Sequence, residues 1–547
     1  MIQSENSKHD DASSTFDSFS SLPVDDCVYR GEGNANLVVS LPREQRVIRF
    51  RKSLPGEASP DDDEIRVKRE VEFVRHVVSG YLGSYVRIPE IVRYDAKDVA
   101  KLLEIIRPFR PEERKWKKNV KDYATKMPDY AFLPSNFSKL DPGSFRSKST
   151  FAVEIKPKQG YQRKEEQRLQ KCPYCLTQYY KSKKKVVKAR SSYCPFDLFS
   201  ADKERMIRAI EGLLRSPQNN LKIFKDGSIV YDEGFPASDV ETVLADWHQS
   251  IDASCTKETN VNLFCNLTCT ALLHSFPQTE RTKVTRVTFE RDRVYRMSDE
   301  RDFEVPGNNN EELIANARKL LSRVKEECKR DGENLPKDCV LERILSMQRL
   351  PYGGTDHVYD IYEKYATLIN DELVYSRLIN STECPRVAST YTFPKRREKE
   401  DRNGHRCVDV DSNWSSVVGR DGSVGLTNDS KQWKVKSSCD NAKYDGDVTS
   451  NDINNDDLLA LQNYLLFCTA RDCSILITFR QLNPEAVSKV PREYVIKLSE
   501  DLYFLTSISV SDVDPKSMHS IAKHRQRDTD VLNSVISLLE EELSLNN

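Results

Sequence analysis

The chain has 547 residues, of which 38% are hydrophobic and 31% charged, and its formal net charge at pH 7 is -1. This length exceeds the size at which one hydrophobic core usually stops growing, so two or more lobes are expected. The near-zero net charge excludes a uniformly basic nucleic-acid-binding protein. No run of about 18 apolar residues and no signal-peptide pattern occurs, and the scattered cysteines fit a reducing compartment. We therefore expect a cytoplasmic or nuclear protein with no membrane partner.

The N-terminal part of the chain is predicted to begin with a disordered tail, residues 1–24, which is rich in serine and aspartate. Residues 28–51 predict two strands, NLVVSL and RVIRF, and a glycine-containing turn. Residues 64–82 carry apolar side chains at helical spacing. Strand, strand, helix is typical of the N-lobe of a kinase-like fold, which we place at residues 25–135.

The next part, residues 136–384, is predicted to be the first part of a C-lobe. It opens with the strand FAVEIKP and a basic connection, followed by the helix KERMIRAIEGLLRS. A hairpin with its turn at Asp226-Gly227 comes next. Residues 236–380 are expected to be mostly helical.

The last part contains a polar insertion and the end of the predicted C-lobe. Residues 385–456 have little apolar content, which predicts a disordered insertion that catalysis does not need. Residues 457–547 form the second part of the C-lobe, with the helix DDLLALQNYLLFCTA, the strand CSILITFR and a final strand pair that ends at Ser511. The expected fold class is α+β.

Two short motifs have the residue types that bind phosphate. The segment Gly31-Glu32-Gly33-Asn34-Ala35-Asn36 lets backbone N–H groups approach a phosphate, although a GxG turn between strands is more often only a turn. In EIKPK, alternation along an extended segment puts Lys156 and Lys158 on one side. Two lysines rarely share a core, so this segment is either an anion site or an exposed basic strand edge.

Amides and carboxylates supply the other candidate groups. Consecutive amides in Pro217-Gln218-Asn219-Asn220 can donate to phosphate oxygens, or simply cap the preceding helix. Asp472, Asp512 and Asp514 border apolar strands, where carboxylates can deprotonate a hydroxyl group or hold magnesium. Most such aspartates are only caps or turn residues.

Basic residues are concentrated between Phe151 and Arg190, where twelve lysines and arginines and three glutamates give a net charge of +9. This charge could hold a polyanion. The alternatives are a solvated surface and nucleic-acid binding through KSKKKVVKAR. Nucleic-acid binding lacks both an aromatic platform and a recognised module.

Three cysteines predict a zinc site in the same segment. Cys172, Cys175 and Cys194 have the spacing C-x2-C-x18-C, and their surroundings are too rich in lysine to pack by hydrophobic burial alone. A distant His or Cys would have to complete the site. Three reduced thiols are the alternative.

Together these segments resemble the inositol-pentakisphosphate 2-kinase family. The matching segments run from residue 28 to about 528 and are VYRGEGNANLVVS, RVIRFRK, FAVEIKPKQG, CPFDLFS, SPQNNLKIF, TARDCSILITF and, more loosely, SDVDPKS. The resemblance implies a kinase-like fold of two lobes with inserted helices that shape the inositol site. The implied reaction is ATP-dependent phosphorylation of the 2-hydroxyl of inositol 1,3,4,5,6-pentakisphosphate, which gives inositol hexakisphosphate, or phytate.

The resemblance also assigns roles to residues. Asp472 is implied as the general base and Lys156 as the contact of the transferred phosphate, while Asp512, with Asp514 beside it, would hold magnesium. The residues implied to cover ATP are Gly31, Glu32, Gly33, Asn34, Ala35, Asn36, Arg49 and Glu154. The implied inositol phosphate ligands are Arg110, or alternatively Arg114, and Lys158, Lys181, Asn219, Asn220, Lys222 and Lys516.

Two substrate positions depart from the family pattern, because Ser520 and His524 stand where relatives can have arginine and tyrosine. A binding protein that takes inositol polyphosphate without turning it over is therefore the second reading. Either protein is expected to be a monomer with no specific nucleic-acid partner.

Overall fold

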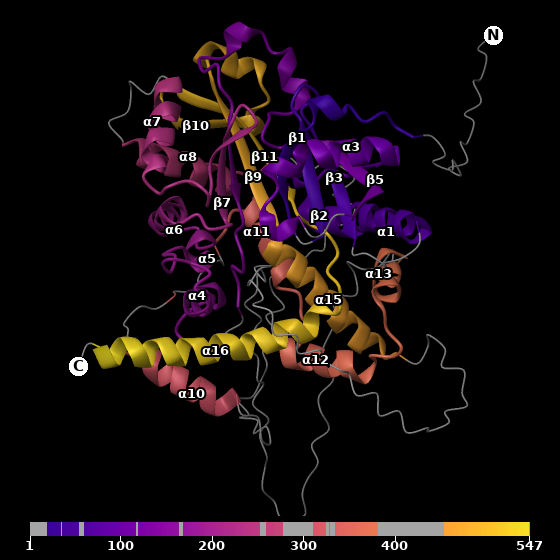
Figure 1. Cartoon of the computed structure of the whole chain (residues 1–547). Helices are drawn as coiled ribbons and strands as arrows, with labels where there is room; N and C mark the ends of the chain where they lie inside the picture. The colour runs from indigo at the N-terminus through magenta and orange to yellow at the C-terminus, as the bar shows by residue number, and fades with distance from the viewer. Residues whose placement is uncertain are drawn as a thin grey trace, which may run out of the picture. The chain divides into compact units, whose positions relative to one another are not determined.

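The computed structural model describes residues 19–33, 35–53, 60–115, 119–162, 168–251, 259–276, 310–323, 328, 334–380 and 453–545 (Figure 1). The chain divides into two compact units. The first comprises Met1–Val71 and Ile88–Asp129, and the second comprises Glu72–Arg87 and Tyr130–Asn547. The predicted lobe boundary at residue 135 lies close to this division. The predicted insertion 385–456 lies outside the described residues up to residue 452.

The first unit is built on a five-stranded antiparallel sheet with the strand order β1-β2-β3-β5-β4. The two predicted strands are confirmed as β2 and β3, and the glycine-containing turn links β2 to an additional strand, β1. The strands are β1 (Val28–Glu32), β2 (Asn36–Leu41), β3 (Arg46–Ser53), β4 (Glu90–Arg93) and β5 (Asn119–Pro128). Helix α3 (Ala96–Ile106) packs its apolar face against them in one core.

The predicted disordered tail ends earlier than residue 24. Residues 1–18 lie outside the described residues, but Ser20 forms a bridge to Tyr94. Leu22 and Val24 are buried in the core of the first unit. This end of the predicted tail packs because the apolar side chains of Leu22 and Val24 are stabilised by burial away from water.

The second unit is built on a six-stranded antiparallel sheet with the order β10-β11-β9-β6-β7-β8. Its strands are β6 (Phe151–Ile155), β7 (Leu221–Lys225), β8 (Ser228–Tyr231), β9 (Ser474–Leu482), β10 (Val495–Ser499) and β11 (Leu502–Ser511). The predicted strands and the hairpin at Asp226-Gly227 are confirmed. Both turn residues have positive φ, 49° and 81°, as a tight hairpin requires. The α+β fold class is confirmed.

Helices of the second unit flank the sheet and extend beyond one end of it (Figure 1). The described helices are α1 (Pro60–Phe73, which spans the division), α2 (Ser79–Leu82), α4 (Pro173–Lys183), α5 (Pro195–Leu198), α6 (Lys203–Arg215), α7 (Asp239–Ser250), α8 (Asn260–Leu273), α10 (Asn310–Leu321), α11 (Val340–Gln348), α12 (Thr355–Lys364), α13 (Asp371–Asn380), α15 (Asn455–Asp472) and α16 (Ser520–Leu545). The predicted helices are confirmed where the structure describes them, but parts of residues 236–380 lie outside the described residues. The predicted helix 64–82 is divided into α1, the π-helical stretch Val74–Val78 and α2, and α16 was not predicted. Helices α4, α10 and α12 pack along α16. None of the described helices is long and apolar enough to cross a membrane.

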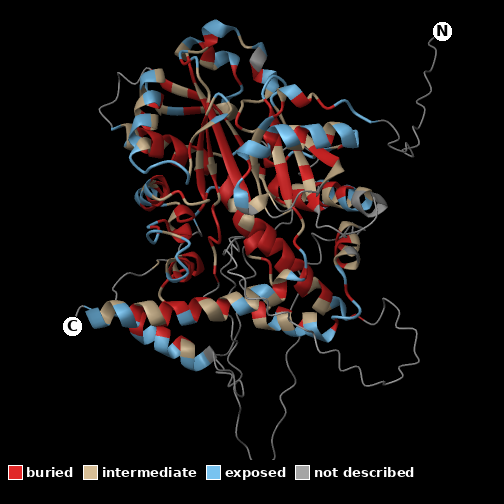
Figure 2. Ribbon diagram, viewed as in Figure 1, coloured by how far each residue is buried: buried red, intermediate tan, exposed pale blue. Residues whose placement is uncertain are grey.

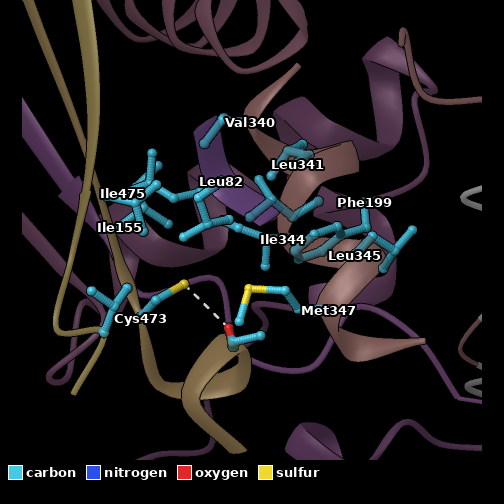
Figure 3. Close-up of a cluster of buried hydrophobic side chains, with 14 of the residues drawn as sticks. Leu82, Ile155, Phe199, Val340, Leu341, Ile344, Leu345, Met347, Cys473 and Ile475 are labelled. Atoms are coloured by element: carbon cyan, nitrogen blue, oxygen red, sulfur yellow. Dashed lines mark hydrogen bonds between the residues drawn. The ribbon is translucent and has the colours of Figure 1, made fainter. Parts of the chain in front are cut away.

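Helix α15 is buried on nearly all sides and leads directly into β9 (Figure 2). A helix that is apolar all round belongs in a core. Helix α11 packs against it and inserts Ile344, Leu345 and Met347 into a cluster with Ile155 of β6 and Ile475 of β9 (Figure 3). These helices therefore support one edge of the six-stranded sheet.

Candidate active site

The register of the six-stranded sheet brings four strand ends together. Ile155, the last residue of β6, lies opposite Leu221 of β7 on one side and opposite Ile475 of β9 on the other. Ser474 of β9 lies opposite Ser511, the last residue of β11. The residues just beyond these ends, which sequence reasoning had selected far apart in the chain, therefore meet at one edge of the sheet.

Lys156 and Asp512 form an ion pair at this edge. Lys156 Nζ lies 3.0 Å from Asp512 Oδ2, and the Ser474 hydroxyl donates to the same oxygen at 3.2 Å. The backbone N–H of Lys156 donates to the Asn220 carbonyl at 2.9 Å. Asp512 has a φ of 58°, a left-handed conformation that costs free energy at a non-glycine residue and is concentrated at functional sites.

Asp472 and Lys516 form a second, more deeply buried pair. Asp472 is the last residue of α15, and its Oδ2 lies 3.2 Å from Lys516 Nζ. A carboxylate at a helix C-terminus is disfavoured by the helix dipole, so capping does not explain an aspartate here. Asp514 follows Asp512, and its carbonyl accepts from the Thr469 hydroxyl at 3.2 Å. The second pair is thus anchored between α15 and the segment after β11.

Buried cations and amides surround these two pairs. Lys158 and Lys181 are both nine-tenths buried, and Lys158 has a φ of 61°. Lys181 Nζ donates to Gln218 Oε1 at 3.3 Å. Burying a lysine ammonium group costs free energy, and an anionic ligand beside it would offset part of that cost. The second unit therefore concentrates positive charge beside its carboxylates.

Several polar residues in this site were not predicted. Gln178, which is buried on α4, accepts from Gln218 Nε2 at 2.9 Å. The Asn220 amide donates to the Tyr174 hydroxyl at 2.8 Å. Gln218 belongs to the predicted PQNN motif, although the resemblance assigns it no role, and it has a φ of 43°. Gln178 and Tyr174 carried no local signal.

Glu154 and Lys222 are register partners on β6 and β7. Residues directly opposite each other in an antiparallel pair have their side chains on the same face of the sheet. Both side chains are half-buried. The resemblance assigns Glu154 to the nucleotide and Lys222 to the inositol phosphate, and the structure puts the two residues next to each other.

In the first unit, Glu32 accepts hydrogen bonds from two cations. Lys52 Nζ donates to it at 2.6 Å, and Arg110 makes a bidentate contact at 2.7 and 2.9 Å. The Glu32 and Lys52 side chains are both 0% exposed. Lys52 was not predicted, although it follows Ile48 and Phe50 on the buried face of β3, where a lysine needs a partner.

This ion cluster determines the ionisation of its members. Burial opposes the charged form of Glu32, but the hydrogen bonds from Arg110 and Lys52 outweigh it, so the pKa of Glu32 falls below its ordinary value. Burial lowers the pKa of Lys52, and the contact with Glu32 offsets part of that effect. The hydrogen bond to Glu32 raises the pKa of Arg110. The hydrogen bonds within the cluster therefore favour the charged forms of Glu32 and Arg110.

The other nucleotide residues implied by the resemblance lie around the β1–β2 turn and on β3. Gly31 sits at a bulge between β1 and β2 and has a φ of 152°, which favours glycine. Lys52 N–H donates to the Ala35 carbonyl at 2.8 Å, and Gly33 N–H donates to the Asn36 carbonyl at 2.9 Å. Arg49 lies opposite Val38 in the sheet. Asn34 lies outside the described residues.

His524 is a neutral residue near the Asp472 pair. Its Nδ1 lies 2.9 Å from the Tyr464 hydroxyl, and burial lowers the pKa of His524 to about 3. A neutral imidazole carries no charge with which to bind phosphate. His524 therefore adds no positive charge to this part of the site.

Four cysteines lie together at the start of α4. The Sγ atoms of Cys172, Cys175, Cys194 and Cys328 all lie within 4.8 Å of one another. The backbone N–H of Cys328 donates to the Gln170 carbonyl at 2.9 Å, which keeps Cys328 beside the segment that precedes α4. The three predicted cysteines lie together in the structure. Cys328 is the distant fourth residue that a zinc site would need and that the sequence did not identify.

The paired carboxylates and buried lysines are the groups that phosphoryl transfer to a polyanionic acceptor requires. A model of the inositol-pentakisphosphate 2-kinase family matches residues 29–530. The chain therefore belongs to the inositol-pentakisphosphate 2-kinase family.

Individual members of this family are similar to the chain over different lengths. The inositol-pentakisphosphate 2-kinase of Danio rerio is 25% identical over 553 residues, which covers 94% of this chain and 93% of that protein. The enzyme of Drosophila melanogaster is 25% identical over 302 residues, or 38% of this chain and 49% of that protein. The enzyme of Oryza sativa subsp. indica is 30% identical over 240 residues, or 38% of this chain and 53% of that protein.

The Glu32 cluster generates a stability prediction. Glu32→Gln leaves two buried cations without their carboxylate, and breaking a buried ion pair costs about 3–5 kcal/mol. We expect the free energy of unfolding to fall by about that amount at pH 7 in chemical denaturation. Glu44→Gln, which removes a half-exposed pair with Lys126, should cost less than about 1 kcal/mol.

The same variant should show a characteristic pH dependence. Because the folded-state pKa of Glu32 is depressed, its contribution is complete above the ordinary carboxylate pKa and is lost as the pH falls through the folded-state value. The difference between wild type and Glu32→Gln should therefore shrink below about pH 4.5. A difference that stays constant on acidification would show that the charge of Glu32 does not stabilise the fold.

Proposed function

We propose that the protein transfers the γ-phosphoryl group of ATP to the 2-hydroxyl of inositol 1,3,4,5,6-pentakisphosphate, and so makes inositol hexakisphosphate. Family membership supports the reaction. The observation that carries the proposal is the meeting of the Lys156–Asp512 and Asp472–Lys516 pairs at one sheet edge, among the buried Lys158 and Lys181. We further propose that the two units are the N-lobe and C-lobe of a kinase-like fold, in a cytoplasmic or nuclear monomer.

In this proposal Asp472 is the general base. Its carboxylate accepts the proton of the 2-hydroxyl as that oxygen attacks the γ-phosphorus and the bond from phosphorus to the bridging oxygen breaks, so that ADP leaves. Lys516 orients the carboxylate through the 3.2 Å contact. Lys156 would steady the transferred phosphoryl group. Positioning and charge neutralisation provide most of the rate in phosphoryl transfer, and these residues supply both.

Asp512 and Asp514 would hold magnesium. Carboxylate oxygens are the ligands that this ion prefers, and the Lys156 contact favours the ionised form of Asp512, so the residues fit the metal. When bound, magnesium would neutralise charge on the ATP phosphates. The nucleotide itself would contact the residues implied by the resemblance, which are Gly31, Glu32, Gly33, Asn34, Ala35, Asn36, Arg49 and Glu154.

The inositol phosphates would be bound by a set of cations and amides. Lys158, Lys181 and Lys516 are all nine-tenths buried, so their charges are poorly screened and would bind phosphate strongly. Asn219, Asn220, Lys222 and Arg110 are the remaining proposed contacts.

We also propose that Cys172, Cys175, Cys194 and Cys328 bind a structural zinc ion. Sulfurs at about 2.3 Å from a tetrahedral zinc lie about 3.8 Å apart. Cys172 Sγ and Cys194 Sγ are 3.8 Å apart, and all four sulfurs lie within 4.8 Å of one another. Cys172 is the N-cap of α4, the helix that carries Lys181. A metal here would fix the start of that helix and thereby Lys181.

The assignment of Asp472 is tested by Asp472→Asn, which keeps the size of the side chain but removes the base. General base catalysis contributes about 10² to 10⁴ in rate, so kcat with inositol pentakisphosphate and ATP should fall by that factor with little change in KM. Asp457→Asn, near the start of the same helix and bonded to Lys364, is the matched control and should be kinetically silent. A folded Asp472→Asn enzyme that keeps more than about a tenth of wild-type turnover would remove Asp472 from this role.

The metal assignment predicts a different result for Asp512→Asn. Because a magnesium ligand is lost, a higher magnesium concentration should be needed for half-maximal turnover. Titration of turnover with magnesium measures this change. An unchanged requirement would exclude Asp512 as a ligand.

Lys158→Ala should affect substrate binding more than the chemical step. Losing one charge-assisted phosphate contact should raise KM for inositol pentakisphosphate about tenfold or more, with kcat less affected. Lys225→Ala, which removes a surface pair with Asp246, is the control. Equal KM values in Lys158→Ala and wild type would contradict the phosphate contact.

The zinc proposal predicts about one zinc per purified chain by elemental analysis. Cys328→Ser should lose most of this zinc and lower the thermal unfolding temperature, because metal binding free energy becomes folding free energy. Cys265→Ser, which alters a buried thiol of α8 outside the cluster, should keep its zinc. If the purified wild-type protein contains no zinc, and if Cys328→Ser is as stable as the wild type, the four cysteines are reduced thiols and not a metal site.

A further inference from the structure

The chain segment that leaves β6 is held by side chains and not by neighbouring strands. The Tyr193 hydroxyl donates to the Pro157 carbonyl at 2.7 Å. The Gln348 amide donates to the Lys158 carbonyl at 2.9 Å, and its Oε1 accepts from Gly160 N–H at 2.8 Å. Buried backbone groups need such partners. One glutamine therefore satisfies two backbone groups directly after the Lys158 side chain, the Lys158 carbonyl and the Gly160 N–H, which flank Gln159.

Gln348 also reaches the other half of the site. Its Nε2 lies 3.4 Å from the carbonyl of Ala470, two residues before Asp472. The same carbonyl accepts from Cys473 Sγ at 3.2 Å (Figure 3). Gln348 thus joins the lysine segment to the C-terminal turn of α15, although it is distant from both in the sequence.

The turn at Lys158 needs to be held. A lysine with a φ of 61° is in a left-handed conformation that it would leave if nothing opposed it. Gly160 packs so closely on Phe199 that an added Cβ would overlap the ring. The turn therefore packs against the Phe199 ring and is hydrogen-bonded to the Gln348 amide.

The helix that carries Gln348 is rigidly placed. Gln348 is the last residue of α11 and is 2% exposed. Ile344, Leu345 and Met347 of the same helix are fully buried in the cluster drawn in Figure 3. Polar groups on well-packed elements hold geometry more accurately than groups on loops.

We propose that Gln348 is a positioning residue for the inositol phosphate side of the site, where it fixes Lys158 in its strained conformation and sets its distance from Asp472. This inference rests on the roles proposed above for Lys158 and Asp472. Gln348 touches no substrate in this scheme. It acts only through the two backbone segments that its amide joins.

The test is Gln348→Met, which conserves shape and removes all three contacts. KM for inositol pentakisphosphate should rise about tenfold, and kcat should fall less. KM for ATP should stay within about twofold, because Lys156 is held by Asn220 independently of Gln348. Hydrogen exchange at the amide of Gly160 should accelerate, since its acceptor is gone. Unchanged exchange, or equal rises in both KM values, would overturn the proposal.

A matched control separates positioning from stability. Gln462, on α15, is also buried, and its Nε2 donates to the Val374 carbonyl at 3.0 Å, a contact that involves none of the proposed site residues. Gln462→Met should lose stability and keep wild-type kinetics. Gln348→Glu is the second variant. It keeps an acceptor for Gly160 but puts a carboxylate where the amide donated to the Lys158 and Ala470 carbonyls, so KM should rise at least as much as in Gln348→Met. If Gln348→Glu and Gln462→Met behave alike, Gln348 is only structural.

A double-mutant cycle separates two hypotheses: that Gln348 positions Lys158, and that Lys158 binds the inositol phosphate. Lys158→Ala alone tests the role of Lys158. If it raises KM, Lys158→Ala with Gln348→Met should raise KM no more than Lys158→Ala does, because both act through one contact. Additive effects would overturn the positioning role of Gln348 and leave the role of Lys158 standing. A silent Lys158→Ala would overturn both.

Discussion

The antiparallel pairing of β6 with β9 is the constraint on which the rest of the second unit depends. It aligns Ile155 with Ile475, so Lys156 and Ser474 follow from the same point of the sheet. A slip of one residue would turn every side chain of β6 to the opposite face. Val153 and Ile155 would then leave the core, which is why the apolar side chains fix the register at which the charged residues meet.

Burying the polar groups at this edge costs free energy, and hydrogen bonds from the surrounding structure offset part of that cost. Where β6 ends, the sheet no longer supplies backbone partners, so Tyr193 and Gln348 supply them from other elements. Lys158 and Lys181, which follow in the chain, are nine-tenths buried, and removing an ammonium group from water costs free energy. In the proposed function, binding of the anionic substrate would offset part of that cost.

Local periodicity predicted most of the strands and helices, because alternation and helical spacing are written into neighbouring residues. The same pattern indicated Lys156 and Lys158 and the aspartates Asp472, Asp512 and Asp514, which stand beside those elements. Lys181, Lys222 and Lys516 were assigned to the site only by the family resemblance. Cys328 and Gln348 could not be predicted, since their partners are brought to them only by tertiary packing. Lys52 and α16 are different: an inward-facing lysine on β3 and regular apolar residues from Ile521 to Leu539 are visible in the sequence. Residues 1–24 were predicted to be a disordered tail from their average composition. That average concealed Leu22 and Val24, which are buried in the core of the first unit.

The order of strands in the second sheet also has a consequence for synthesis on the ribosome. The chain from Lys156 to Cys473 lies between β6 and its partner β9, so β6 emerges long before that partner exists. Until then one edge of β6 offers unpaired N–H and C=O groups to other chains, which is a known route to aggregation. The first unit, by contrast, needs nothing beyond Asp129. Nascent chains should therefore consist of a folded first unit and an open second sheet that requires protection until β9 and β11 leave the exit tunnel.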